Sequence, residues 1–181
     1  MKSLFKFNIH KYYIYRNINK LNNFIKLNEE YKLIIFEDIN KLKKYKFKLI
    51  NLESLREGIL NKAIAFCIIF KDEIIHITWV AQNNNAKKFV DDLPTNFSWD
   101  KSALWGRSYT NINHRNKNLY SFTQQELQKY LYKKNITYQY FSIKIKNKTS
   151  IQAMNKFNPE IIKVVYRVNF FIFRFKIYIN K

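Results

Sequence analysis

The chain has 181 residues, 47% hydrophobic and 18% aromatic, so it is long enough to bury a core as one folded domain and too apolar to be a disordered polymer. Its formal net charge of +20 indicates an anionic ligand or partner, although Lys, Asn, Ile, Phe and Tyr share AT-rich codons and genome bias is a competing explanation. From residue 103 onward the only acidic residues are Glu126 and Glu160, so this C-terminal part is strongly basic.

The first third of the chain contains few regular signals. Residues 1–30 are rich in Lys, Asn and Tyr without a clear period, so we expect an N-terminal extension or an irregular first layer there, followed by the main domain at 31–181. The apolar run 33–36 predicts a strand, and apolar residues at helical spacing over 49–60 predict a helix.

The middle of the chain predicts a hairpin, then a loop and a central strand. Two apolar β-branched runs, 66–70 and 74–81, flank a short polar turn and predict antiparallel strands. Residues 82–101 predict a loop with one helical turn. Residues 102–110 predict a strand in which Gly106 marks a bulge or a close backbone approach.

The C-terminal part alternates helices and strands. Apolar residues near one face predict a helix that begins at Leu119, and alternation over 136–145 predicts a half-buried strand with a second helix after it. Alternation over 171–179 predicts that the chain ends in a long amphipathic strand. Together these elements predict an α/β (α+β) fold, with a mixed, mostly antiparallel central sheet and flanking helices.

Several further features narrow the class of protein. Cys67 lies in an apolar run and is interpreted as a small buried hydrophobic residue, and the absence of spaced Cys/His clusters gives no reason to expect a metal. Asn8, His10 and Lys11 interrupt the apolar core that a signal peptide needs, and no segment stays apolar over the roughly 20 residues of a membrane-spanning helix. We therefore expect a cytoplasmic protein without a metal or a transmembrane segment.

The strongest functional signal is a basic loop between the strand at 102–110 and the helix that begins at Leu119. The loop contains Arg115 and Lys117. Backbone N–H groups at a helix start carry partial positive charge and bind phosphate oxygens, and the two cations add full charges. The loop therefore predicts a binding site for a phosphorylated ligand.

This loop and a later segment resemble the central motifs of the GCN5-related N-acetyltransferases. The family's Arg/Gln-x-x-Gly-x-Gly/Ala motif is matched by residues 115–120, and its Asn-x-x-Ser/Ala motif by Asn147 and Ser150, in the same order along the chain. The resemblance is clearest over residues 60–168. It implies the acyl-CoA N-acyltransferase fold and acetyl-CoA as the cosubstrate.

The resemblance also implies roles for individual residues. In that family the loop amides hold the pyrophosphate of acetyl-CoA, the preceding strand receives the pantetheine arm, and a backbone N–H near Tyr109 or Thr110 would polarise the thioester carbonyl. The acceptor attacks the thioester directly, without a covalent enzyme intermediate. The cofactor-binding residues implied in this way are Thr110, Arg115, Asn116, Lys117, Asn118, Leu119, Tyr120, Asn147 and Ser150.

Two positions depart from the family's pattern. Asn118 stands where the family prefers glycine, but asparagine tolerates a left-handed backbone better than most residues, so a tight loop is still expected. Met154 stands at the position of the family's tyrosine general acid and cannot donate a proton to the leaving thiolate. Acyl transfer by this chain therefore requires another group, or water, as the proton source.

His76 and Tyr109 are the candidate catalytic residues. A histidine titrates near neutrality, so His76 is a candidate general base, and a core or edge histidine is the alternative interpretation. Tyr109 is a candidate hydrogen-bond donor to the thiolate or the acceptor, and simple packing is the alternative in a chain with 13 tyrosines. Trp79, Trp99 and Trp105 either wall an acceptor pocket or pack in the core.

The sequence thus favours an acetyl-CoA-dependent N-acetyltransferase that moves an acetyl group to the amine or hydroxyl of a small-molecule acceptor, with aromatic walls that would suit a sugar-linked one. The alternative is a catalytically inactive protein of the same fold that binds RNA or another large anion, for example as a ribosome-associated component. Net charge and Met154 favour this alternative, but no RNA-binding signature supports it. Peripheral membrane binding is a third interpretation, without an amphipathic basic helix to support it.

Overall fold

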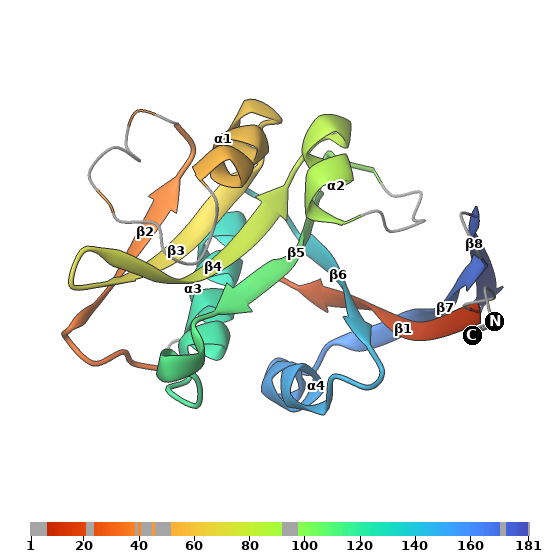
Figure 1. The fold of residues 1–181 in the computed structure, drawn as a ribbon. Helices are drawn as coiled ribbons and strands as arrows, with labels where there is room; N and C mark the ends of the chain where they lie inside the picture. The colour runs from red at the N-terminus through yellow and green to blue at the C-terminus, as the bar shows by residue number, and fades with distance from the viewer. Residues whose placement is uncertain are drawn as a thin grey trace, which may run out of the picture. The chain divides into compact units, whose positions relative to one another are not determined.

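The computed structural model describes residues 7–20, 24–38, 40, 45, 52–91, 98–170 and 173–180 (Figure 1). The chain divides into two compact units. The larger unit comprises residues 18–139, and the smaller unit combines residues 1–17 with residues 140–181. The larger unit therefore holds the basic loop, and the smaller unit holds Asn147, Ser150 and Met154.

An antiparallel sheet forms the centre of the larger unit. Its strands, in spatial order, are β2 (Tyr31–Phe36), β3 (Ile64–Phe70), β4 (Glu73–Ala81) and β5 (Ser102–Thr110). Its helices are α1 (Leu52–Leu60), α2 (Asn84–Val90), the short 3-10 helix η2 (Ile112–His114) and α3 (Leu119–Lys133). Spatial order follows chain order, so each strand pairs with the next one along the sequence.

Helices cover both faces of this sheet (Figure 1). Trp79 of β4 packs against Phe89 of α2 with ring centroids 4.9 Å apart, whereas His76 of the same strand lies 6.3 Å from the ring of Tyr120 in α3. Side chains three positions apart on a strand point to opposite faces, so α2 and α3 lie on opposite sides. A strand covered on both sides needs apolar residues at successive positions, which explains why β3 is apolar and buried along almost its whole length.

A tight turn joins β3 to β4 and confirms the predicted hairpin. Lys71 has φ 47° and Asp72 has φ 61°, and two left-handed residues in succession are typical of the type I′ turns that suit the twist of a hairpin. Cys67 lies on β3 without exposed surface. Burial raises the pKa of the Cys67 thiol, so the reactive thiolate is disfavoured, as expected for a packing residue.

The smaller unit is built on antiparallel pairing between its N-terminal and C-terminal strands. In spatial order these are β6 (Tyr138–Lys144), β1 (Phe7–Ile18), β7 (Glu160–Phe170) and β8 (Phe173–Asn180), and the helix is α4 (Lys148–Asn155). Tyr15 of β1 stacks on Phe141 of β6 with centroids 5.0 Å apart. The alternation predicted for β6 is confirmed, because Phe141 and Ile143 are buried between half-buried neighbours.

Two elements differ from the sequence-based expectation. Residues 7–18 form the regular strand β1 rather than an extension or an irregular layer, because pairing with β7 organises a segment that has no period of its own. The terminal strand expected over 171–179 is present as β8, and the strand before it, β7, with which it pairs, was not expected. The domain boundary at residue 31 stays a prediction. The α/β fold with a mostly antiparallel sheet and flanking helices is confirmed.

Gly58 leaves room for the aromatic contact between α1, α2 and β4. A Cβ atom there would lie 2.6 Å from Cη2 of Trp79 and 2.7 Å from Cε1 of Phe89. We expect Gly58→Ala to lower the free energy of unfolding by about 1–3 kcal/mol, because two packed rings must move, although alanine is the better helix former. Urea unfolding measures the change.

The control for this experiment is Arg56→Ala, which removes an exposed side chain from the same helix. It should change the free energy of unfolding by less than about 0.5 kcal/mol. Equal stability of the wild type and Gly58→Ala would contradict the packing described here.

Candidate functional site

β5 carries a β-bulge where it passes Thr78 of β4. The register of the two strands shifts between Ile77 and Trp79, so that Arg107 and Ser108 of β5 together stand opposite Thr78. Arg107 has φ 46°, in the left-handed region. The bulge predicted for this strand is confirmed, and it lies directly after Gly106 rather than at the glycine itself.

Gly106 and Arg107 hold this part of β5 against α2. A Cβ atom on Gly106 would lie 3.1 Å from the carbonyl oxygen of Val90, so the glycine permits the close backbone approach that the sequence predicted. The guanidinium of Arg107 lies over the ring of Phe89, 4.4 Å from its centroid. This cation–π contact fixes the side chain of the strained bulge residue.

The loop after β5 contains two left-handed asparagines. Asn116 has φ 62°, and Asn118 has φ 57° and ψ 14°. The glycine-like backbone expected at Asn118 is therefore confirmed. The N–H of Phe122 donates to the carbonyl of Asn118 at 2.8 Å, and the Asn118 side chain makes no capping hydrogen bond to α3. The positive end of the helix dipole thus begins at this loop.

Arg115 and Lys117 are exposed, and contacts within the larger unit hold both of them. Nε of Arg115 donates to the carbonyl oxygen of Thr110 at 3.4 Å. Nζ of Lys117 donates to the hydroxyl of Tyr31 at 3.0 Å, and that hydroxyl lies 3.4 Å from Nδ1 of His114. Desolvation, and then the charge of Lys117, lower the pKa of His114, so Arg115 and Lys117 carry the loop's positive charge near pH 7.

Leu119 and Tyr120 turn their side chains toward the core. Leu119 is 2% exposed and packs with Ile68 and Ile75. The ring of Tyr120 is half-buried and lies 6.0 Å from that of Trp105. Because the side chain of Leu119 is buried, any contact of this residue with a ligand would come from its backbone N–H.

His76 is completely buried and bonded through both ring nitrogens. Nδ1 lies 2.7 Å from Oγ1 of Thr110, and Nε2 lies 3.2 Å from Oγ1 of Thr78. Burial lowers the pKa of His76 to about 3, so the ring is neutral at physiological pH. These features favour the core-histidine interpretation over direct general-base catalysis on an acceptor.

Tyr109 and the tryptophans differ in exposure. Tyr109 is 45% exposed, and its catalytic role stays a prediction. Trp79 and Trp105 are each 3% exposed, which favours core packing over a pocket wall. Trp99 is half-buried and donates from Nε1 to Oδ1 of Asn84 at 2.9 Å.

Asn147 and Ser150 form the N-terminal cap of α4. Oδ1 of Asn147 accepts a hydrogen bond from the backbone N–H of Ser150 at 3.2 Å, which accounts for the Asn-x-x-Ser spacing as local helix capping. Their contact with a cofactor stays a prediction. Met154 of the same helix has no exposed surface, so this side chain serves packing.

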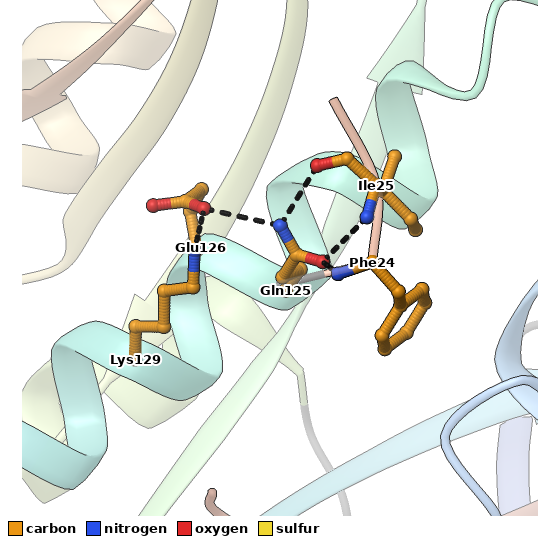
Figure 2. A network of polar contacts seen from close by, with 5 residues as sticks. All are labelled: Phe24, Ile25, Gln125, Glu126 and Lys129. Atoms are coloured by element: carbon orange, nitrogen blue, oxygen red, sulfur yellow. Dashed lines mark hydrogen bonds and ion pairs between the residues drawn. The ribbon is translucent and has the colours of Figure 1, made fainter. Parts of the chain in front are cut away.

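Buried polar residues are the features that the sequence analysis missed. Gln125 of α3 has no exposed surface, and its side chain is hydrogen-bonded to the backbone of the segment that precedes β2 (Figure 2). Its Oε1 accepts from the backbone N–H of Phe24 at 3.0 Å and of Ile25 at 2.9 Å, and its Nε2 donates to the carbonyl of Ile25 at 2.9 Å. The available signal was the run of glutamines on an amphipathic helix, where a polar residue falls on the apolar face.

No group of three or more His, Cys, Asp or Glu side chains among the described residues is placed to hold a metal ion. None of the helices in the described segments is long and apolar enough to cross a membrane.

Comparison of the whole chain with known proteins gives a structural match only. No family model and no curated protein matches the sequence. A GCN5-related N-acetyltransferase-like protein from Streptococcus suis matches 91% of this chain and 62% of its own, with a TM-score of 0.59 and 12% identity. A tandem GNAT protein from the clavulanic acid biosynthesis pathway matches over 90% of this chain and 54% of its own length, with a TM-score of 0.60 and 11% identity.

A third solved structure, a GCN5-related N-acetyltransferase from Sphaerobacter thermophilus, matches 90% of this chain and 52% of its own, with a TM-score of 0.60 and 8% identity. The chain has the GCN5-related N-acetyltransferase fold. It spans from about half to under two thirds of the length of these three structures. The fold expected from the two motifs is thereby confirmed.

The left-handed backbone at Asn118 generates a stability prediction. Asn118→Val should lower the free energy of unfolding by about 1–3 kcal/mol, because a β-branched residue is strained at positive φ, whereas Asn118→Gly should be neutral or slightly stabilising. Urea unfolding separates the two variants. Asn113→Val, in the same loop but without a positive φ, is the control and should cost clearly less. Similar losses for both valine variants would contradict the strain argument.

The hydrogen bonds from Gln125 to the backbone of residues 24 and 25 generate a second prediction. Gln125→Leu keeps the approximate volume but leaves two backbone N–H groups and one carbonyl without their partner, so we expect a loss of about 2–4 kcal/mol of stability. Thermal or urea unfolding measures it. Gln152→Leu, exposed on α4, is the matched control and should be close to neutral. An unchanged stability for Gln125→Leu would show that water replaces these bonds.

Proposed function

We propose that the protein is an acetyl-CoA-dependent N-acetyltransferase that acts on a small-molecule acceptor. The observation that carries this proposal is the left-handed Asn118 at the start of α3, on a loop that also presents Arg115 and Lys117. A glycine-like residue there lets successive backbone amides converge on one anion. The fold supplies the expectation that this anion is the pyrophosphate of acetyl-CoA.

The residues of the loop suit a phosphorylated cosubstrate chemically. The amides of residues 116–120 would offer hydrogen bonds at the positive end of α3, and Arg115 and Lys117 would add charge-assisted bonds. Tyr31 holds the ammonium of Lys117 in position, at 3.0 Å from its hydroxyl. Because both cations are exposed, salt should weaken their contribution to binding.

The chemistry proposed for the site is direct attack on the thioester. The acceptor amine attacks the carbonyl carbon, the C–S bond breaks, and the sulfur leaves as a thiolate that must gain a proton. A backbone N–H at Tyr109 or Thr110, beside the bulge, would stabilise the developing oxyanion. Positioning of the two reactants provides much of the rate, so no nucleophilic side chain is required.

Binding of RNA remains the competing function, and the ion pairs of α3 weigh against it. Nζ of Lys129 lies 2.6 Å from Oε1 of Glu126, and Nζ of Lys134 lies 3.3 Å from Oε1 of Glu37. Carboxylates therefore offset two of the lysines that would form a basic stripe on this helix. Phosphate contacts in nucleic-acid binding need cations that are not already paired in this way.

Arg115→Ala tests the proposed cosubstrate site. We expect acetyl-CoA to bind the wild type with saturable heat at low salt and more weakly at high salt, and the variant to lose about 1–3 kcal/mol of binding free energy, because a charge-assisted hydrogen bond to phosphate is removed. Isothermal titration calorimetry measures both effects.

Arg56→Ala is the matched control, since it removes one exposed arginine far along the sequence from the loop and should leave the affinity unchanged. Absence of saturable heat with folded wild-type protein would refute the proposal. Release of free thiol with amine acceptors would extend it to catalysis, whereas tight RNA binding without thiol release would favour the competing function.

A further inference from the structure

Four polar side chains form a continuous hydrogen-bonded chain across β4 and β5. Oγ1 of Thr110 lies 2.7 Å from Nδ1 of His76, Nε2 of His76 lies 3.2 Å from Oγ1 of Thr78, and Oγ1 of Thr78 lies 2.9 Å from Oγ of Ser108. His76 and Thr78 are 0% and 1% exposed, while the two end residues, Ser108 and Thr110, are half-buried. This series of hydrogen bonds thus runs through the core and ends at a partly exposed residue on each side. We name it the polar relay.

The β-bulge is what brings the relay together. Thr110 stands opposite His76 and Gly106 stands opposite Trp79, so β5 has one more residue than β4 between these two pairs. If β5 continued without the bulge from the pair of Gly106 and Trp79, Arg107 would stand opposite Thr78, and Ser108 would stand opposite Ile77 on the other face of the sheet. A residue in a strained left-handed conformation therefore serves the alignment of one serine hydroxyl.

Because the buried ring of His76 is neutral, it carries one N–H and one acceptor nitrogen. The relay can therefore run in either of two directions. In the direction that ends on Ser108, Thr110 donates to Nδ1, Nε2–H donates to Thr78, and Thr78 donates to Ser108. The hydroxyl proton of Ser108 then points away from the relay and is available to a ligand.

We propose that Ser108 is the general acid of the reaction and that the relay supplies its proton. This inference rests on the proposed function. Ser108 lies two residues before Thr110, on the same face of β5, and the backbone N–H of Thr110 is one of the two candidates for the oxyanion donor, so we expect the Ser108 hydroxyl near the thioester. Met154, buried at the position of the family's tyrosine acid, leaves that role vacant. Thr78 and His76 act through Ser108 and are positioning residues.

The protons and electrons of this step balance. The electron pair of the breaking C–S bond stays on sulfur, and the sulfur takes the hydroxyl proton of Ser108. Ser108 takes the proton of Thr78, Thr78 takes the proton of Nε2, Nδ1 takes the proton of Thr110, and Thr110 takes one from water. The acceptor nitrogen releases one proton to solvent, so nothing is gained or lost.

Side chains from α3 and β3, and two arginines, lie beside the relay. From α3, the ring of Tyr120 faces His76 at 6.3 Å. From β3, Ile68 stands opposite His76 and Phe66 opposite Thr78, and both are apolar. Two charged residues adjoin the relay: Arg107 is next to Ser108 in the sequence, and Nε of Arg115 donates to the carbonyl oxygen of Thr110 at 3.4 Å.

The experiment compares coenzyme A with desulfo-coenzyme A, which lacks the thiol, in calorimetric titrations at pH 6.5 and pH 9.0. A hydroxyl donor facing the sulfur stabilises the bound thiolate and lowers the pKa of the bound thiol. We expect the affinity ratio of the two ligands to rise by about three- to tenfold between these pH values in the wild type, since one unit of pKa corresponds to a factor of ten. Ser108→Ala should abolish most of this rise.

Variants of Thr78 test the relay itself. Thr78→Val removes the bridging hydroxyl at similar volume and should reduce the rise, while Thr78→Ser restores the hydroxyl and should keep it. Thr123→Val is the control, because Thr123 is a buried threonine of α3 whose hydroxyl forms no hydrogen bond within the described residues. It should leave the affinity ratio at both pH values unchanged.

The outcomes separate this inference from the function on which it rests. If both ligands bind but their affinity ratio does not change with pH in the wild type, the relay has no role at the sulfur, and the cosubstrate site stands. If Thr78→Val weakens both ligands equally and keeps the rise, Thr78 is only structural and the relay is overturned. If neither ligand binds folded protein, the proposed function fails and the inference fails with it.

Discussion

The β-bulge at Arg107 is the constraint on which the rest of the site depends. In an antiparallel pair, one extra residue moves every later side chain to the opposite face. Here it aligns Ser108 and Thr110 with His76 and Thr78, on the side of the sheet that α3 covers. A non-glycine residue at positive φ costs on the order of 1–3 kcal/mol, and the packing of Arg107 on Phe89 helps to offset that cost.

The loop geometry depends on a second set of contacts, which begins far from the loop in sequence. Gln125 holds the backbone at Phe24 and Ile25, and this segment leads into β2 (Figure 2). The first residue of β2, Tyr31, holds Lys117 through its hydroxyl. A residue in the second turn of α3 thereby helps to fix a cation at the start of the same helix. The loop is placed by its neighbours as well as by its own left-handed asparagines.

Sequence reasoning identified the elements that rest on local patterns. The strand at 102–110, the helix from Leu119 and the hairpin after β3 follow from periodicity and turn chemistry, and the left-handed Asn118 follows from a motif position. The sequence did not predict β1, because its extended conformation comes from pairing with β7, more than 140 residues away along the chain. The relay was missed for a related reason, since Thr78 and Ser108 meet only through a bulge whose register no single strand encodes.

Position 154 shows how the chemistry of this fold depends on packing in a specific chain. Met154 has no exposed surface and Phe157, one turn later, has 1%. A tyrosine at 154 would be larger, and its hydroxyl would need a hydrogen-bond partner at a position without exposed surface. Overpacking of a close-packed core typically costs 1–3 kcal/mol. A single substitution to tyrosine at this position would therefore strain the smaller unit, and this favours the proton source that we propose on β5.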